Sequence, residues 1–329
     1  MPASRPEPGL RGQNERVLDV RGQAGTGNGG VVTSSGIGWA ALGVLAFSVT
    51  FPATTLAERT FDPLLVGAGR SVIAAVIAMI CLRVLSAPLP RRDHWAGLIA
   101  VGLGCGIGFG ALSALALHHT TSSHAAVVVG LLPAATATVG VIRTGDRPGP
   151  LFWGASLLGT IVVTAYALSR GGGSLHEADL LLLGSVVVAA IGYAEGGRLT
   201  REIPGWQVTA WGLLVALPVS LALTLVALLG SSAGHLRTPA ILGFAYVGTI
   251  STFVGFFAWY RGLAEGGVAR ASQLQLLQPL LTIAWSIPLL GEMVDATGLL
   301  AAVLVGICVL ITQKARVTRR PPGGFWLRR

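Results

Sequence analysis

Long apolar runs alternate with short polar connections through most of this chain. Between Ile37 and Thr312 these runs are about 20 residues long, which is the length that an α-helix needs to cross the hydrocarbon core of a bilayer. Hardly any charged residue lies inside them, and turn-forming residues such as Asp62-Pro63 and Pro148-Gly149-Pro150 lie between them. The pattern therefore predicts an all-α polytopic membrane protein.

The apolar runs define ten predicted transmembrane helices with short connections. In chain order they are Ile37–Leu56, Leu64–Leu85, Trp95–Leu117, Ala125–Ile142, Leu151–Leu168, Leu180–Arg198, Val208–Leu229, Ala240–Tyr260, Ala269–Leu290 and Ala296–Thr312. Residues 1–35 have no period that could bury a face and are expected to be a disordered tail, and residues 314–329 a basic tail. Because about 35 residues precede the first run, we interpret it as an uncleaved helix rather than a signal peptide.

Composition and charge agree with a membrane protein. Hydrophobic residues make up 52% of the chain and charged residues 11%, against about 25% charged in soluble domains. Nineteen of the 23 Arg and Lys residues fall on one side of the predicted spans, and three, Arg59, Arg170 and Arg237, fall on the other. This bias predicts a multi-pass protein of the inner (plasma) membrane with both termini in the cytoplasm. Charges sorted by side of the bilayer, rather than gathered on one folded face, give no indication of a nucleic-acid partner.

Two segments repeat one pattern at an offset of 146 residues. Ser122–Asp146 and Val268–Glu292 each contain an apolar run with a proline, Pro133 or Pro279, and each ends in Gly followed by an acidic residue. Each half of the chain would then hold five helices. Because five is odd, the second half would enter the membrane from the opposite face, which predicts two inverted five-helix repeats of the kind found in many secondary transporters.

These segments resemble the EamA-type family of the drug/metabolite transporter superfamily. The stretch that matches best is Phe257–Pro279, followed by Leu290-Gly291-Glu292, whereas the first half matches more loosely through Ala116–Pro133, Gly145-Asp146 and the approach from Asp62-Pro63 to Arg70. The resemblance covers Ile37–Thr312. It implies two EamA-like repeats, at residues 36–170 and 171–313.

The resemblance implies a secondary active transporter. Such a protein would export a small polar or amphipathic metabolite or drug across the inner membrane by alternating access, with proton exchange as a possible energy source. The chain contains no GxxxxGK[ST], GxSxG or HExxH motif, so neither ATP-driven transport, nor hydrolase chemistry, nor a cofactor is indicated. The alternative from another class is a membrane-embedded enzyme acting on a lipid-linked substrate, which would need paired acids or metal ligands at one depth; the sequence shows neither, so a non-enzyme is expected.

A stripe of polar residues follows the ninth predicted span. Spacings of three and four place them on one helix face, with Gln278 at its flank: Ser272, Gln275, Pro279, Thr282 and Ser286. Pro279 has no N–H for the carbonyl of Gln275, so a free acceptor and a kink are expected there. The stripe would either line a path for a hydrogen-bonding solute or form hydrogen bonds between helices.

Three further side chains have two interpretations each. Arg70 lies about two turns inside the second span and would either attract a carboxylate-bearing solute or extend its charge outward to the membrane surface. Glu195 precedes Arg198 by three residues and would either form a helix-surface ion pair or carry a coupling proton. Tyr260 would either anchor its helix at the membrane interface or contact the solute.

The histidines and cysteines do not indicate a metal site. His118, His119 and His124 lie in one predicted external connection, where a solvated loop is expected. Three cysteines lie inside apolar runs without ligand spacing and are expected to be small packing residues: Cys81, Cys105 and Cys308. The substrate, its coupling ion and the oligomeric state are not indicated by the sequence.

Overall fold

The computed structural model describes residues 34–144, 147–170, 176–200, 202–230, 236–266, 274–293, 295–314 and 317–318. Nearly all of these residues are helical, which confirms the predicted helical fold class. Ser272 of the predicted polar stripe and Asp146 of the repeated Gly–acid pair lie outside the described residues, as does the predicted N-terminal tail through residue 33.

The helices of the first half follow the predicted spans in order. They are α2 (Ser34–Ser48), α3 (Thr50–Glu58), α4 (Pro63–Val84), η1 (Arg92–His94), α5 (Trp95–Val101), the π-helical segment η2 (Gly102–Gly108), α6 (Phe109–Leu117), α7 (Ser122–Val129), α8 (Leu132–Thr144) and α9 (Pro150–Arg170). The start of α4 shows why the boundaries could be located from sequence. The Asp62 carboxylate accepts hydrogen bonds from the backbone N–H groups of Leu64 and Leu65 at 2.8 and 3.2 Å, and Pro63 begins the helix, where its missing N–H costs nothing.

The second half has a similar order of elements. They are α10 (Glu177–Leu199), α11 (Gly205–Gly230), α12 (Thr238–Tyr246), the π-helical segment η3 (Val247–Gly255), α13 (Phe256–Gly266), the 3-10 turn η4 (Gln275–Leu277), α15 (Gln278–Leu290) and α16 (Ala296–Lys314). Two short strands, β1 (Arg147–Pro148) and β2 (Val317–Thr318), pair antiparallel, with Arg147 opposite Thr318.

Within the described residues, seven helical stretches are long and apolar enough to cross a membrane. Three shorter apolar helices, Pro150–Tyr166, Gln278–Leu290 and Ala296–Ile311, fall where the fifth, ninth and tenth spans are predicted. The multi-pass architecture is therefore confirmed, and the count of ten stays a prediction.

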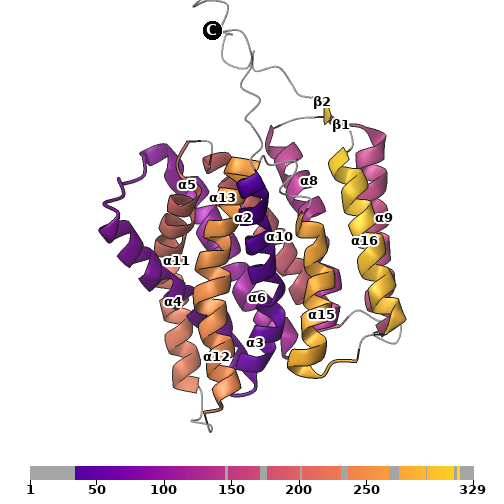
Figure 1. The fold of residues 1–329 in the computed structure, drawn as a ribbon, viewed down its shortest axis with the longest axis horizontal. Coiled ribbons are helices and arrows are strands. Elements are labelled where there is room, and N and C mark those ends of the chain that lie inside the picture. The colour runs from indigo at the N-terminus through magenta and orange to yellow at the C-terminus, as the bar shows by residue number, and fades with distance from the viewer. Residues whose placement is uncertain are drawn as a thin grey trace, which may run out of the picture. The chain divides into compact units, whose positions relative to one another are not determined.

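Helices of the two halves pack against each other in matched pairs. The second span contacts the seventh (α4 with α11), the fourth contacts the ninth (α7 with α15), and the fifth contacts the tenth (α9 with α16). The first span contacts the eighth (α2 with α13, α3 with α12), and the third contacts the sixth (α6 with α10). Figure 1 shows α4 beside α11, α2 beside α13 and α9 beside α16. If each span is replaced by its equivalent in the other half, the same five pairs of spans result.

The π-helical segments occur at related positions in the two halves. η2 lies in the third span of the first half, and η3 lies in the third span of the second half. Each π-helical turn leaves the regular backbone bonding of an α-helix and is often found at functional sites. Residues from both segments line cavities described below.

Candidate functional site

Two adjoining cavities lie between helices of both halves. The first, here called the proline cavity, is lined by Phe51, Ala126, Val129, Gly130, Leu132, Pro133, Gln275, Gln278, Pro279, Thr282, Val305 and Gly306. The second, here called the arginine cavity, is lined by Phe47, Thr50, Phe51, Arg70, Cys105, Phe109, Leu132, Ala189, Tyr193, Ser251, Phe256 and Gln278. Phe51, Leu132 and Gln278 line both cavities, so the two adjoin.

Helix interruptions shape the proline cavity. α7 ends at Val129 and α8 begins at Leu132, while α15 begins directly after the 3-10 turn η4. Pro133 and Pro279, which the repeat relates, therefore both lie in the first turn of a helix. The prediction that the carbonyl of Gln275 is free is wrong. This carbonyl accepts a hydrogen bond from the backbone N–H of Gln278 in the 3-10 turn.

The polar stripe of the ninth span divides into two parts. Gln275, Gln278, Pro279 and Thr282 line the proline cavity. Thr282 also donates its hydroxyl to the carbonyl of Ser48 at 2.8 Å. Ser286 is fully buried and donates to the carbonyl of Thr282 at 2.9 Å. Gln275, Gln278 and Pro279 therefore line the cavity, whereas Ser286 forms a hydrogen bond within its helix. Thr282 does both, because it lines the cavity and bonds to the first span.

Arg70 is the charged group of the arginine cavity. Its residue is 2% exposed, so the interpretation that its side chain extends to the membrane surface is wrong. The guanidinium carbon lies 5.8 Å from the centre of the Phe109 ring. Nε is buried and has no hydrogen-bond partner among the described residues. Gly110 leaves the space for this group, because a Cβ there would lie 2.7 Å from Nε.

Hydroxyl, amide and aromatic groups complete the arginine cavity. The hydroxyls of Thr50 and Ser251 lie 2.7 Å apart and come from the first and eighth spans. Gln278 adds an amide from α15, and the rings of Phe256 and Tyr193 stack with their centres 5.8 Å apart. The lining combines one cation, neutral hydrogen-bonding groups and apolar surface, which is the usual make-up of a site for a small organic molecule.

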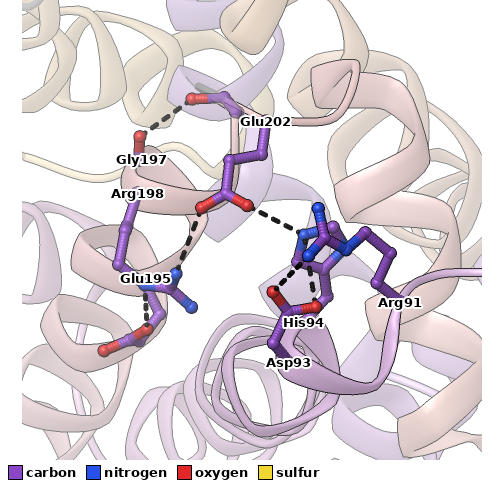
Figure 2. A network of polar contacts seen from close by, with 8 residues as sticks. Arg91, Asp93, His94, Glu195, Gly197, Arg198 and Glu202 are labelled. Carbon is purple, nitrogen blue, oxygen red and sulfur yellow. Dashed lines mark hydrogen bonds and ion pairs between the residues drawn. The ribbon is translucent and has the colours of Figure 1, made fainter.

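Glu195 lies in a separate charged network at the end of α10. Arg198 donates its Nε to the Glu195 carboxylate at 3.1 Å and lies 3.6 Å from Glu202. Figure 2 shows that Glu202 also contacts His94, at 3.0 Å. The ion pair expected from the i,i+3 spacing is present, and Glu195 is not among the residues that line the two cavities.

The same network contains three groups that could hold a metal ion. Ligand atoms of Asp93, His94 and Glu202 lie within 4.8 Å of one another, with His94 buried and both carboxylates exposed. Sequence spacing gave no signal for this cluster, because His94 and Glu202 are 108 residues apart. The Glu202 carboxylate already has contacts with His94 and Arg198, so these polar contacts account for the cluster without a metal ion.

Tyr260 is buried inside the protein rather than exposed at a membrane interface, so the anchoring interpretation is wrong. It is 2% exposed and packs with Ala40, Val44 and Trp259. Its ring centre lies 6.0 Å from that of Phe256, which lines the arginine cavity. Tyr260 therefore lies behind the cavity wall.

His124 differs from the solvated position expected for it. It is 6% exposed, its Nε2 lies 2.7 Å from the Asp179 carboxylate, and its ring stacks on Tyr166 at 5.2 Å. His118 is exposed, in keeping with the expectation. No local pattern indicated the buried position of His124, because its partner Asp179 lies 55 residues further along the chain on α10.

Glu292 joins the end of α15 to the start of α7. Gly291 has a φ of 71°, a left-handed conformation that ends α15 and that glycine adopts without strain. The Glu292 carboxylate then accepts hydrogen bonds from the backbone N–H groups of Ser122 and Ser123 at 2.8 and 3.0 Å and from the Ser123 hydroxyl at 2.6 Å. A carboxylate at a helix N-terminus is favoured by the helix dipole, so this contact links the two halves.

Glu265, which lies beyond the apolar part of the eighth span, links the ends of the first and eighth spans. Arg261 donates its Nε to the Glu265 carboxylate at 2.7 Å, and Ser35 donates its hydroxyl at 3.1 Å. The hydrogen bond from Arg261 lowers the pKa of Glu265 below its usual value. The Arg261 guanidinium also lies over the ring of Trp39, at 4.4 Å.

Comparison with known proteins explains why the two halves look alike. The EamA-like transporter family model matches the chain twice, at residues 34–168 and 176–313. The chain belongs to the EamA-like transporter family. Among the described residues, each EamA-like segment contains one π-helical segment, and Pro133 and Pro279 lie in helix first turns at positions that the repeat relates.

The curated relatives are transporters by name. The uncharacterized transporter YdeK of Bacillus subtilis (strain 168) is 42% identical over 273 residues, which is 83% of this chain and 95% of YdeK. The uncharacterized transporter YyaM of the same organism is 24% identical over 287 residues, which is 81% of this chain and 91% of YyaM. A protein crystal structure matches with a TM-score of 0.61 and 18% identity over 85% of this chain and 99% of that chain, a likeness in fold. This EamA-like chain is therefore a membrane transporter.

Proposed function

We propose that the chain is a secondary transporter that exports a small organic solute, with the proline and arginine cavities as its substrate site. The observation that carries the proposal is the convergence of polar groups from both EamA-like segments on these cavities. Arg70 and Thr50 come from the first segment, and Ser251 and Gln278 come from the second. A solute held between two segments changes its access when the segments rock against each other.

The segments 36–170 and 171–313 act as inverted repeats in this proposal, and both termini lie in the cytoplasm. The helix pairs, which stay the same when equivalent spans of the two halves are exchanged, support a repeated architecture. The bias of nineteen to three in Arg and Lys supports the cytoplasmic placement of the termini. Export across the inner membrane is the direction that the family resemblance implies. Protons are the proposed coupling ion.

The contact between Glu292 and the start of α7 is the proposed closure on one side. It joins the second segment to the first through three hydrogen bonds. Since the predicted topology places this end outside the cell, the described conformation would be closed to the outside. Rocking of the segments would break the contact and open the cavity there.

The enzyme alternative has no supporting observation. Neither cavity has a pair of acidic residues among the residues that line it. The Asp93, His94 and Glu202 cluster lies outside these linings, and two of its three side chains are exposed.

A comparison of metabolites tests the proposal. Cells that overexpress the chain should release at least one small metabolite faster than cells that lack it, and cells that lack it should accumulate that metabolite. Gln278→Leu, which removes an amide from both cavities, should abolish the difference. Thr160→Val is the matched control, because Thr160 is exposed on α9 and donates its hydroxyl to the carbonyl of Ser156 within its own helix. Identical metabolite release with and without the chain would contradict the proposal.

A further inference from the structure

The Arg70 guanidinium is a buried cation that lacks a counter-charge among the described residues. It is 2% exposed, and its Nε has no hydrogen-bond partner. No described carboxylate lies within ion-pair distance of it, although other arginines of the chain have such partners, for example Arg198 and Arg261. A buried charge without a partner is strongly unfavourable. This chain therefore carries, inside the membrane, a charge that an anion from outside the chain would satisfy.

The lining of the arginine cavity offers no negative charge to balance Arg70. The residues that line the cavity include no acidic side chain. The guanidinium therefore sets the sign of the field at this place. An anion is favoured at this place, and an ammonium group is not.

The other walls of the cavity fit an apolar body. Phe109 lies against the guanidinium, and Phe51 stacks on Phe109 with ring centres 6.1 Å apart. Phe47, Tyr193 and Phe256 line the cavity as well. Because an aromatic wall contacts rings and aliphatic chains better than it contacts strongly hydrated groups, the body of the solute should be apolar.

We infer that the transported solute is a small monoanionic carboxylate with an apolar body, and that its carboxylate binds Arg70. This inference rests on the proposed transport function and names the substrate class for it. The carboxylate would accept two parallel N–H donors from the guanidinium, and the apolar body would lie among the rings. A zwitterionic amino acid would place its ammonium group in the same positive field without a carboxylate to receive it.

Three probes of almost equal size separate charge from shape. They are 3-phenylpropionate, its neutral amide 3-phenylpropionamide, and the zwitterion phenylalanine. Binding is measured by calorimetry on the full chain in lipid nanodiscs. The acid should bind about tenfold or more tightly than either of the other two, because charge-assisted hydrogen bonds are each stronger than neutral ones. Equal binding of acid and amide, tighter binding of phenylalanine, or no binding of the acid at about 10 mM overturns the inference.

Variants of Arg70 assign the effect to this side chain. Arg70→Gln should reduce the affinity for the acid about tenfold or more and leave the amide unchanged, and Arg70→Lys should keep part of the preference because it keeps the charge. Unchanged preference in Arg70→Gln overturns the assignment. The ranking of the three probes by the unaltered chain needs no variant, so it decides the substrate class even if Arg70→Gln fails to fold.

Uptake into proteoliposomes distinguishes failure of this inference from failure of the proposed function. Protein-dependent exchange of the amide or of phenylalanine, with no preference for the acid, would leave the transport function standing and refute the substrate class. Tight binding of the acid without any protein-dependent exchange would support the binding site and refute transport.

Discussion

Removing the carboxylate of Glu292 should open the cavity on the side where that residue lies. In the described conformation Glu292 accepts three hydrogen bonds from Ser122 and Ser123 at the start of α7. Glu292→Gln keeps the size of the side chain but removes its charge and one acceptor position. Because the contact joins the two halves, its loss should weaken the closed state without disturbing either half internally.

The expected size of the effect follows from the groups involved. Loss of a side-chain cap at a helix N-terminus costs about 1–2 kcal/mol, and hydrogen bonds to charged groups lie in a similar range of about 1.5–3 kcal/mol. If the contact exists only in the state closed on this side, a change of about 1–2 kcal/mol shifts the equilibrium toward the open state by about 5- to 30-fold.

The assay uses a single cysteine at Gln278, which lines both cavities, in a background without Cys81, Cys105 and Cys308. A membrane-impermeant thiol reagent added from the Glu292 side should react about 5- to 30-fold faster in Glu292→Gln. The matched control is Asp295→Asn, because Asp295 caps its own helix α16 through the N–H of Gly298 at 3.0 Å. An unchanged rate, or an equal increase in the control, would refute the reasoning.

Further expectations concern topology, the polar stripe and coupling. A reporter fused at Arg329 should be active only if it is of the cytoplasmic type, and activity of a periplasmic reporter would contradict the even number of spans. Cysteines placed at Gln275 and Thr282, which line the proline cavity, should react with a small polar thiol reagent and be protected by substrate. A cysteine at Ile287, whose side chain is 51% exposed, should react much less because it faces lipid; equal reaction at all three positions would refute the path. If Glu195 serves only its contact with Arg198, Glu195→Gln should leave the pH dependence of efflux unchanged, and a shifted pH profile would instead favour proton coupling through this residue.

Long helices could be predicted from the sequence because their signal is local. The second span was predicted at Leu64–Leu85 and is found at Pro63–Val84, and the seventh was predicted at Val208–Leu229 and is found at Gly205–Gly230. Apolar composition is sufficient for both, and the start of the second span is also marked by the capping residue Asp62. The interruption before Leu132 and the 3-10 turn before Gln278 were not predicted, because the backbone bonds that replace regular helix at these positions depend on the packing of neighbouring helices.

The candidate site was predicted in part. The spacing of polar residues located the face of Gln275, Gln278 and Thr282 that lines the proline cavity. By contrast, the lack of a hydrogen-bond partner for the Arg70 Nε among the described residues depends on what surrounds it in three dimensions. The contact of Glu292 with Ser122 spans 170 residues of sequence, and no local pattern contains that information.

The central claim is that this chain carries a solute across the membrane by alternating exposure of one cavity, and counterflow tests it most directly. Proteoliposomes are preloaded with the unlabelled metabolite that cells lacking the chain accumulate, and a trace of labelled metabolite is added outside without ATP. The account predicts a transient internal accumulation of label above its equilibrium level, which Gln278→Leu abolishes and Thr160→Val preserves. Label that only rises to its equilibrium level, at the rate seen in liposomes without protein, would contradict the account.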